Sequence, residues 1–487
     1  LQGHIIHDWP AMIAVGEETR YVGDAIALVA AETRQQAKEA AAKIRLDYEV
    51  LPPLVDPKRA LDEDAPRLHP KGNLLATSRL KRGDPDKAIA EAAIVVRKTF
   101  RTPETEHAFM EVESALAIPG EDGTLTVYTG TQSIYDDHKG VVGVLGLPPE
   151  KVKVVSAYVG GGFGGKEDLI VQHHAALLAW KLKAPVKLTL DRQESIRVHP
   201  KRHAFEMDYV VAADADGHVT AVKADLLQDT GAYASLGGPV LQRACTHGAG
   251  PYRIPNVEIV GTGVYTNNPP GGAFRGFGVT QSCFAMESCL NLIAKEAGLT
   301  PWEVRWRNAC GPGDTLPNGQ LCDEGTGLKE TLLAVKEICE RRPDAGIACA
   351  MKNAGIGVGL PDVGRVKLKV EGGKAVIYTS AACMGQGLAS VLEQFVAEIA
   401  GLSWGQIAVA PPDTSNSPNS GTTTASRQTL FTGEAACRAA ADLKKDLATA
   451  TLAELQGKEY YAEFSGVTDP FASDKENPVS HVAYSYA

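Results

Sequence analysis

The segment Gly160-Gly161-Gly162-Phe163-Gly164-Gly165-Lys166-Glu167 says most about the fold of this chain. It follows a strand-like stretch at residues 152–158 and precedes a helix-like stretch at residues 169–183. Its glycines match the pattern G-x-G-x-x-G, and with Lys166 they come close to the phosphate-loop pattern G-x-x-x-x-G-K-[ST]. The segment therefore predicts a strand–loop–helix unit whose backbone packs closely against its surroundings.

Two nucleotide-binding interpretations of this loop fit poorly. A dinucleotide loop belongs to the first β-α-β unit and needs a ribose-binding acid about 20 residues later, whereas here the strand expected at residues 185–190 ends at Asp191-Arg192. A triphosphate loop needs a hydroxyl group after its lysine to bind Mg²⁺, and Glu167 offers a carboxylate instead. A phosphate-loop nucleotidase stays as an alternative hypothesis, which failure to bind ATP with Mg²⁺ would exclude.

Three further loops are rich in glycine, serine and threonine, and each leads towards an expected helix: residues 269–278, 383–387 and 420–426. Backbone N–H groups at helix N-termini and nearby hydroxyl groups bind anions without any net positive surface. Any one of these loops alone is an ordinary turn. Together with the glycine loop they predict a site for a large polyanionic cofactor.

The composition excludes several functional classes. A net charge of -10 and the lack of a basic stripe argue against binding of nucleic acid. No apolar run approaches the length of a membrane span. None of the 9 cysteines forms C-x-x-C, so they are expected to be reduced thiols in a cytoplasmic protein and not ligands of an iron–sulfur cluster.

The order of expected elements indicates an α+β (mixed α/β) fold with several lobes. At 487 residues the chain is long enough for about two to four domains. We expect a β-α-β unit near the start, with strands at 21–31 and 44–50 around a helix at 32–45, a hairpin at 114–129, and long antiparallel strands at 205–232. Further helices are expected at 84–93, 138–147, 282–297, 387–400 and 433–455, with additional strands at 355–380 and 407–411.

The motifs VGGGFGGKE, AFRGFG and MGQG, in this order, resemble those of the molybdenum hydroxylase family of xanthine dehydrogenase and aldehyde oxidase. The resemblance implies a hammerhead-like domain at 1–75, a connecting segment at 76–94, a first molybdopterin-binding lobe at 95–330 and a second, incomplete lobe at 345–487. It also implies a bacterial large subunit that is truncated at both ends.

In such enzymes a molybdopterin holds the metal, so the resemblance implies no direct protein ligand and explains why no His/Cys/Asp cluster has metal spacing. Gln132 would hydrogen-bond the metal's oxo ligand, and Arg275 and Gln386 would contact the pterin and its phosphate. The remaining assignments place Phe163 and Gly164 next to the metal and Ala425 and Ser426 on a loop that passes it.

The resemblance implies that Glu167, Arg243 and Phe277 bind the substrate. It also implies catalytic roles for Gln132, Arg243 and Glu167. The carboxyl group would bind the heterocycle, the guanidinium would stabilise developing charge, and the ring would stack on a flat substrate. Bland alternatives are an acid at a helix N-terminus for Glu167 and a solvated or salt-bridged surface residue for Arg243. The pair favours an N-heterocycle such as xanthine or a related purine, although residues 359–364 lack the second stacking aromatic ring. An aldehyde oxidoreductase of the same family is the nearest alternative.

The implied reaction needs parts that this sequence does not contain. The family's general base is a glutamate that would lie beyond Ala487, and an inactive fragment is therefore a further alternative. We expect 2Fe-2S clusters and FAD to reside on partner subunits, a molybdopterin with the cytosine dinucleotide as one possible form, and assembly as a dimer of heteromers.

Overall fold

The computed structural model describes residues 1–342 and 345–487. The chain divides into two compact units, each built from three separate segments. Unit 1 comprises Leu1–Pro53, Glu106–Lys201 and Pro361–Gly466, and unit 2 comprises Leu54–Thr105, Arg202–Leu360 and Val467–Ala487. Both units combine sheets with helices, which confirms the mixed fold class. The domain boundaries expected at residues 75, 94, 330 and 345 stay a prediction.

The first sheet of unit 1 carries the glycine loop. Its strand order is β5-β4-β3-β6, where β3 is Ser114–Pro119, β4 is Leu125–Thr129, β5 is Val152–Ser156 and β6 is Val186–Thr189. β3 and β4 form the expected antiparallel hairpin, and Gly123 in its turn has a φ of 75°. The helices α3 (Ile134–Leu145) and α4 (Gln172–Leu182) pack on this sheet, and α5 (Arg192–Val198) follows β6.

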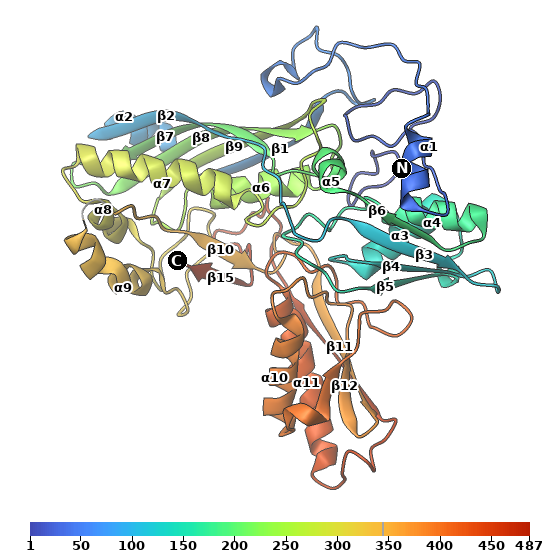
Figure 1. Cartoon of the computed structure of the whole chain (residues 1–487). Helices are drawn as coiled ribbons and strands as arrows, with labels where there is room; N and C mark the ends of the chain where they lie inside the picture. The colour runs from blue at the N-terminus through green and yellow to red at the C-terminus, as the bar shows by residue number, and fades with distance from the viewer. Residues whose placement is uncertain (343–344) are drawn as a thin grey trace. The chain divides into compact units, whose positions relative to one another are not determined.

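The second sheet of unit 1 has the order β13-β12-β11-β14, with β11 at Asp362–Glu371, β12 at Lys374–Tyr378, β13 at Ile407–Val409 and β14 at Glu459–Gly466. Figure 1 shows the helices α10 (Leu388–Ala400) and α11 (Gln428–Leu447) side by side along this sheet. Alternate residues of β11 are buried, and Val366, Leu368 and Val370 pack against apolar positions of both helices. This alternation is the pattern of a sheet with one covered face.

The start of unit 1 differs from the expected β-α-β unit. Its helix forms as α1 (Arg34–Ala41), with a capping box at Thr33. Residues 21–31 and 44–50, however, are not in strands, so both strand predictions are wrong. The apolar side chains of the second segment, Tyr48 among them, are exposed. A strand exists only where a neighbour completes its hydrogen-bond ladder, and among the described residues Ile13 makes a single backbone bond, to Ala25, and no ladder forms with either segment.

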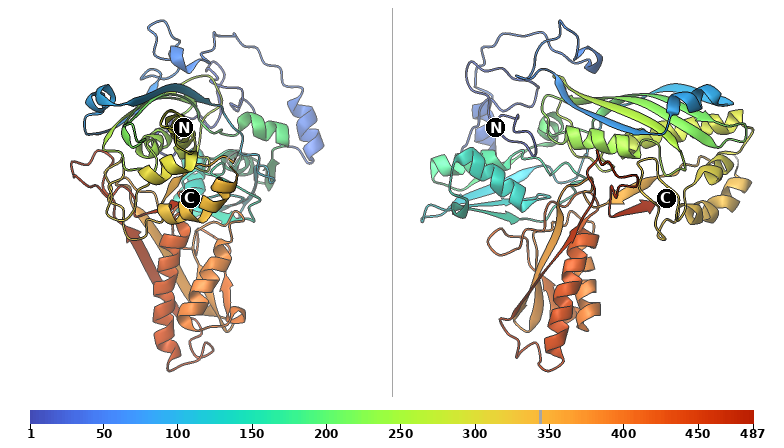
Figure 2. Two further views of the ribbon diagram at one scale, coloured as in Figure 1. Left: turned by 90° about the vertical axis from the view of Figure 1, so that its left-hand side faces the viewer. Right: turned by 180° about the vertical axis from the view of Figure 1, so that it is seen from behind.

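Unit 2 is centred on a five-stranded sheet of order β1-β9-β8-β7-β2. The views in Figures 1 and 2 both show α6 (Gly237–His247) and α7 (Val279–Glu296) on the same face of this sheet. The core between them holds Met207, Tyr209, Leu241 and Ile293, all fully buried. The strands are β1 (Leu74–Arg82), β2 (Ile94–Thr102), β7 (Ala204–Ala213), β8 (Val219–Gly231) and β9 (Asn256–Tyr265).

The rest of unit 2 consists of short elements. The helices are α2 (Pro85–Glu91), α8 (Pro301–Asn308), α9 (Leu328–Arg341) and the short helix η1 (Pro57–Arg59). β10 (Met351–Ala354) pairs antiparallel with β15 (Ala483–Tyr486), which brings together segments that are far apart in the sequence. Unit 1 also has the short helices η2 (Pro149–Lys151) and η3 (Trp404–Gln406).

Most of the other expected elements form within a few residues of their predicted bounds. The strands at 205–232 and the helices at 84–93, 282–297 and 387–400 appear as β7 and β8, α2, α7 and α10. The helix expected at 433–455 begins five residues earlier, directly after Arg427, which is anchored by buried bonds. It ends at Leu447. No helix in the described part of the chain has the length and apolar character that a bilayer crossing requires.

Candidate functional site

The glycine loop, residues 160–167, follows β5 and is packed against other side chains of unit 1. A Cβ atom on Gly162 would lie 2.6 Å from Oε1 of Gln132, and one on Gly165 would lie 2.5 Å from Nε2 of His199. Contacts this short force a neighbour to move. Glycine is therefore required at both positions by the close packing of the loop.

Lys166 settles the phosphate-loop alternative. Its side chain is buried, its Nζ lies 2.7 Å from Oε2 of Glu111, and it sits over the ring of Phe109. In a phosphate loop the lysine ammonium must point at the phosphates. Here it is occupied by a carboxylate of the protein, so the structure offers no support for a nucleotide triphosphate site at this loop.

Gln132 joins the glycine loop to the loop at residues 420–426. Its Oε1 accepts hydrogen bonds from the backbone N–H groups of Gly164 (2.9 Å) and Lys166 (3.3 Å). Its Nε2 donates to the carbonyl oxygen of Thr423 at 2.8 Å and to Oε1 of Glu167 at 3.3 Å. Gln132 is buried. Its amide thus fixes the position of two loops and of the Glu167 carboxyl group.

Glu167 is only 4% exposed and behaves as a weak acid. Burial raises its pKa to about 8, although the charge of His4 and the hydroxyl group of Thr424 act in the opposite direction. At neutral pH the carboxyl group is therefore protonated and able to donate a hydrogen bond. The interpretation of Glu167 as an ordinary acid at a helix N-terminus is wrong, because α4 begins five residues later and Gln172 lies in its first turn.

Two further ionisable groups with shifted pKa values lie in the same unit, and the motifs did not reveal them. Burial lowers the pKa of His4, but Asp168, at 3.4 Å, and neighbouring acids raise it to a net value of about 9. Asp137, in the first turn of α3, is fully buried, and this burial raises its pKa to about 8. A half-buried histidine near residue 1 and a buried aspartate after Gln132 carry no local sequence signal, so only the folded structure identifies them.

The loop at residues 420–426 is held from within unit 1 by Arg427. This fully buried side chain pairs with Asp362 at 2.5 Å and donates to the carbonyl oxygens of Ser420 and Val363. A buried arginine with a carboxylate and several carbonyl partners is a rigid anchor. The loop that it fixes carries Ala425 and Ser426.

Backbone strain is concentrated at residues that the motifs assigned to the site. Phe163, Phe277, Ala425 and Ser426 all have a positive φ, between 47° and 56°. They form half of the eight non-glycine residues with positive φ among the residues described. Such conformations cost about 1–3 kcal/mol each and persist mainly at functional sites. Phe163 is in addition 46% exposed, which is unusual for a large apolar ring held in a strained loop.

The loop at residues 383–387 opens α10. Oε1 of Gln386 accepts from the N–H of Met384 at 2.6 Å, and its Nε2 donates to the carbonyl oxygen of Ala382 at 3.1 Å. The backbone N–H groups at this helix start face the sulfur of Cys383 and lower the pKa of its thiol, against the effect of burial. The loop also approaches the glycine loop, because a Cβ on Gly162 would lie 3.1 Å from Cγ of Met384.

Arg243 lies in unit 2, in the middle of α6, and is only 6% exposed. Its Nη1 donates to Nε2 of His481 at 2.8 Å and its Nη2 to the carbonyl oxygen of Ile356 at 2.7 Å. Burial lowers its pKa to about 10. The alternative of a solvated or salt-bridged surface residue is wrong, because this guanidinium is buried and no carboxylate of the described residues pairs with it.

The loop at residues 269–278, also in unit 2, leads into α7 through Gly278, whose φ is 91°. A Cβ on Gly278 would lie 2.3 Å from the carbonyl oxygen of Val240 in α6, so only glycine allows this approach. Phe277 packs against the core of unit 2, and Arg275 is exposed, with its carbonyl oxygen bonded to Nη2 of Arg202 at 3.0 Å.

The ten predicted site residues thus fall into two groups. Unit 1 holds seven of them, of which Gln132, Gly164 and Glu167 are linked directly by hydrogen bonds. The others in unit 1 lie on the same three loops: Phe163, Gln386, Ala425 and Ser426. Unit 2 holds Arg243, Arg275 and Phe277.

A group of ionisable residues beside the glycine loop has donor atoms within 4.8 Å of one another: Glu106, His107 and His199. These donor types suit a divalent metal. Two of them are already engaged, however, since His199 bonds the carbonyl oxygen of Gly165 at 2.7 Å and Glu106 pairs with Lys201 at 2.7 Å. We therefore assign this group to the support of the glycine loop.

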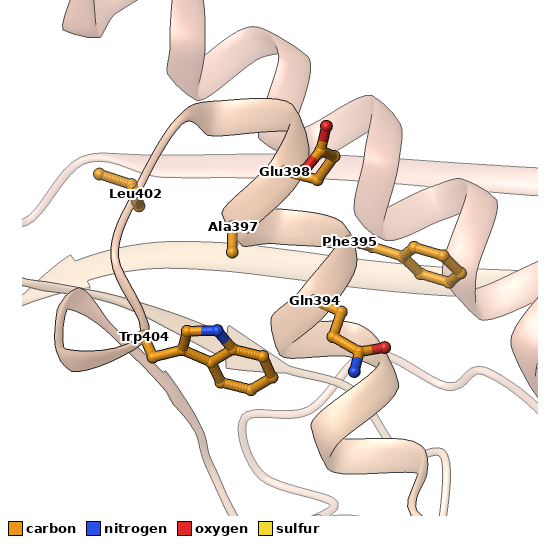
Figure 3. Close-up of a pocket in the computed structure, with 6 residues that line it drawn as sticks. All are labelled: Gln394, Phe395, Ala397, Glu398, Leu402 and Trp404. Carbon is orange, nitrogen blue, oxygen red and sulfur yellow. The ribbon is translucent and has the colours of Figure 1, made fainter.

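A surface pocket of about 460 Å³ lies elsewhere in unit 1. Figure 3 shows residues that line it near the C-terminal end of α10, including Phe395, Leu402 and Trp404. The predicted residue Gln386 precedes the opposite end of the same helix. None of the ten predicted site residues lines the pocket, so it is not part of the candidate site.

Comparison with known protein families matches the three parts of the chain in sequence order. Residues 2–52 match the a/b hammerhead domain of aldehyde oxidase and xanthine dehydrogenase. Residues 68–309 and 326–484 each match the molybdopterin cofactor-binding domain. The large molybdopterin subunit of nicotinate dehydrogenase from Eubacterium barkeri is 42% identical over 69% of this chain and 78% of that protein. The chain belongs to the xanthine dehydrogenase and aldehyde oxidase family.

Other members of the family agree with this assignment. A probable xanthine dehydrogenase subunit from Bacillus subtilis (strain 168) is 37% identical over 95% of this chain. The solved structure of aldehyde oxidoreductase from Desulfovibrio gigas has a TM-score of 0.86 at 26% identity and covers 94% of this chain. The chain spans 62% of the Bacillus protein and 53% of the Desulfovibrio protein.

Proposed function

We propose that this chain binds a molybdopterin cofactor and takes part in the hydroxylation of an N-heterocycle, with water as the source of oxygen. The observation that carries the proposal is the strained backbone at Phe163, Ala425 and Ser426 in unit 1 and at Phe277 in unit 2. Strain of this kind is retained where a bound group needs a particular backbone shape. All four positions were assigned to the site from motifs alone.

The helix starts fit the anionic cofactor. The helices α7, α10 and α11 begin at Gly278, Gly387 and Arg427, and none has a side chain that caps its N-terminus. The helices α3, α5 and α8 are capped by Ser133, Asp191 and Thr300, whereas α6 and α9 also lack a side-chain cap. The N–H groups at the starts of α7 and α11 can bind phosphate and pterin oxygens, and those of α10 face the sulfur of Cys383. Gly164, Arg275 and Gln386 belong to the same loops, and we propose that they contact the cofactor.

The cofactor, when bound, supplies the metal that activates water and accepts two electrons. Gln132 holds the loops around it, and the protonated Glu167 donates a hydrogen bond to a nitrogen of the substrate ring. Arg243 neutralises the negative charge that develops on the ring during attack. Phe277 gives a flat surface for stacking. Each role uses a side chain whose burial or geometry is unusual for a surface residue.

The buried side chains of Glu167 and Arg243 favour a heterocycle over an aldehyde. A neutral carboxyl group and a buried guanidinium can both bond a ring with nitrogen and oxygen substituents, whereas an aldehyde offers one acceptor. Xanthine or a related purine fits this description, and so does a pyridine such as the one named for the Eubacterium relative. The likeness to an aldehyde oxidoreductase supports the second candidate, oxidation of an aldehyde.

We further propose that the chain works in the cytoplasm with an iron–sulfur subunit and an FAD subunit, in a dimer of heteromers. The bound pterin would be the cytosine dinucleotide form. The cysteines support the proposal of such partners. All nine are free thiols dispersed over the chain, and their spacing does not match that of an iron–sulfur site. In this proposal the electrons leave to cofactors held by other chains.

The proposed function is tested on the protein purified together with its partner subunits. We expect metal analysis to find molybdenum and acid oxidation to release a fluorescent pterin. We also expect turnover of xanthine or pyridine substrates with incorporation of ¹⁸O from labelled water. An active preparation without molybdenum, or oxygen that comes from O₂, would refute the proposal.

A further inference from the structure

Four basic side chains of unit 2 interact electrostatically, and we call them the cationic cluster: Arg243, His247, Lys352 and His481. Arg243 and His247 lie one turn apart on α6, and Lys352 is on β10. Arg243, His247 and His481 are buried, whereas Lys352 is half-buried and so reachable from outside. The rings of His247 and His481 are 5.4 Å apart.

The hydrogen bonds fix the charge of His481. A guanidinium only donates, so Nε2 of His481 must accept the bond from Arg243. Nδ1 then carries the hydrogen and donates to the hydroxyl oxygen of Tyr484 at 2.8 Å, which also accepts from Nδ2 of Asn318. His481 is therefore neutral. It orients Arg243 but cannot compensate its charge.

No carboxylate of the described residues lies within ion-pair distance of Arg243 or Lys352. Burial, and then the charge of Arg243, lower the pKa of Lys352 to about 7. Burial, with Lys352 and Arg243 after it, holds the pKa of His247 well below its ordinary value. Nε2 of His247 is buried and has no hydrogen-bond partner among the described residues. By contrast, the other two fully buried arginines, Arg305 and Arg427, pair with Glu287 and Asp362.

A buried guanidinium with no carboxylate partner is costly, and so is a partly buried ammonium that has only the amide oxygen of Asn353 as a partner. Proteins normally place a carboxylate beside such groups. A bound anion removes this cost and also gains a charge-assisted hydrogen bond from each cation. A ligand that balances the charge of the cluster needs only a small negative charge. The cluster holds one permanent cation, Arg243, and one lysine that is close to half-protonated at neutral pH. A carboxylate meets this condition better than a doubly charged phosphate does.

We propose that the cationic cluster binds a carboxylate on the substrate ring, and that Lys352 is the residue that selects such anionic heterocycles. The inference rests on the proposed function, since it takes Arg243 to lie at the substrate. It narrows the substrate class from N-heterocycles in general to heteroaromatic carboxylic acids. Lys352 would contact the carboxylate directly, and His481 acts as a positioning residue for Arg243.

The test compares pyridine-3-carboxylate with its neutral isostere, pyridine-3-carboxamide, on the complete enzyme with its partner subunits. Dissociation constants are measured by calorimetry without an electron acceptor, and kcat/KM with one. We expect the wild-type protein to prefer the carboxylate by at least about tenfold, which corresponds to about 1.4 kcal/mol. Lys352→Met should abolish this preference, and Lys352→Arg should restore most of it.

The control is Lys374→Met, which removes an exposed lysine at the start of β12, next to the turn that follows β11. It should leave both ligands unaffected. Inorganic phosphate is added as a competitor, and we expect it to displace the carboxylate only weakly. The inference would be overturned if the wild-type protein bound the carboxylate and the carboxamide with equal affinity. It would also be overturned if Lys352→Met lost affinity for both ligands equally, or if phosphate bound more strongly than the carboxylate.

The failure of the inference can be told apart from that of the proposed function. A carboxylate preference that depends on Lys352, in a preparation that holds no molybdenum and oxidises no heterocycle, would refute the proposed function and leave the binding site standing. If the enzyme turned over neutral and anionic rings at equal rates, and Lys352→Met did not change them, the proposed selectivity would be refuted. The proposed hydroxylase activity would still stand.

Discussion

Glu167 shows how one side chain gains its chemistry from distant residues. Its neighbours in the sequence include a glycine and a buried lysine, but its acidity depends on burial and on His4, Asp136 and Asp168. A carboxyl group with a pKa of about 8 is neutral below that pH and ionised above it. Any step that needs Glu167 as a hydrogen-bond donor is therefore favoured at low pH and lost as the pH rises through about 8.

This gives a prediction for the pH profile of the complete enzyme. With a heterocyclic substrate, the wild-type kcat/KM should fall about tenfold between pH 7 and pH 9, because ionisation removes the donor. Glu167→Gln keeps an N–H donor at every pH, and its profile should stay flat within about twofold over this range. The exposed Glu150→Gln serves as control and should follow the wild type. An unchanged alkaline decline in Glu167→Gln would show that another group titrates.

The residues of the candidate site were predictable to different degrees. Gln132, Glu167 and Arg243 could be named from the sequence because the resemblance to the family assigns a role to each of these positions. His4 and His199 could not, because each lies in an unremarkable local sequence and approaches the glycine loop only through the fold. Lys352 was missed for the same reason: a lysine in a short strand is ordinarily exposed.

At the scale of elements, loops and helices act as pairs in this protein. The helices α7, α10 and α11, which have no side-chain N-cap, each begin where a glycine-, serine- or threonine-rich loop ends. Glycine-rich loops have few side chains of their own and are positioned by neighbours such as Gln132 and Arg427. The loop shape therefore depends on how closely these neighbours approach.

A pair of glycine substitutions tests this dependence. Gly165→Ala places a Cβ 2.5 Å from Nε2 of His199, so we expect the free energy of unfolding to fall by about 1–3 kcal/mol and activity to fall with it. Gly143→Ala, in α3 with nothing within 4 Å of the new Cβ, should instead raise it by about 0.5–1 kcal/mol. Chemical denaturation of both variants measures the difference. An equal effect at the two positions would contradict the packing argument.

Sequence patterns predicted most helices and strands but failed in two informative ways. The helix α6, which carries Arg243, was not expected, because Gly237, Gly238 and Pro239 at its start are typical of turns. Proline and glycine are tolerated in a first helical turn, and here burial against the sheet compensates for their low propensity. The strands expected at 21–31 and 44–50 have the right residue types, yet pairing partners decide whether a strand forms.

At the scale of the whole molecule, the chain passes from one compact unit to the other five times. No pattern in the sequence marks these crossings, because both units are mixed α/β and their linking segments are short. Contacts between residues more than a hundred positions apart hold each unit together, for example Gln132 with Thr423 and Arg243 with His481.

Interrupting the chain at a crossing should therefore not separate its parts. We predict that cleavage at a protease site inserted between Gly466 and Val467 leaves residues 467–487 bound, since β15 pairs with β10 and the backbone N–H of His481 bonds Gln320. The cut protein should elute as one species from a sizing column and show two fragments on a denaturing gel. Release of the short fragment under native conditions would contradict this.

The bond between Arg243 and His481 also sets an order of events during synthesis on the ribosome. These partners are 238 residues apart, and at about 5–20 residues per second they leave the ribosome many seconds apart. Until His481 emerges, the nascent chain holds a lone arginine on α6 with no strand β15 to pair with β10. Before that moment only the carbonyl oxygen of Ile356 is present to hold the guanidinium, so Arg243 reaches its final orientation after residue 481 has been made.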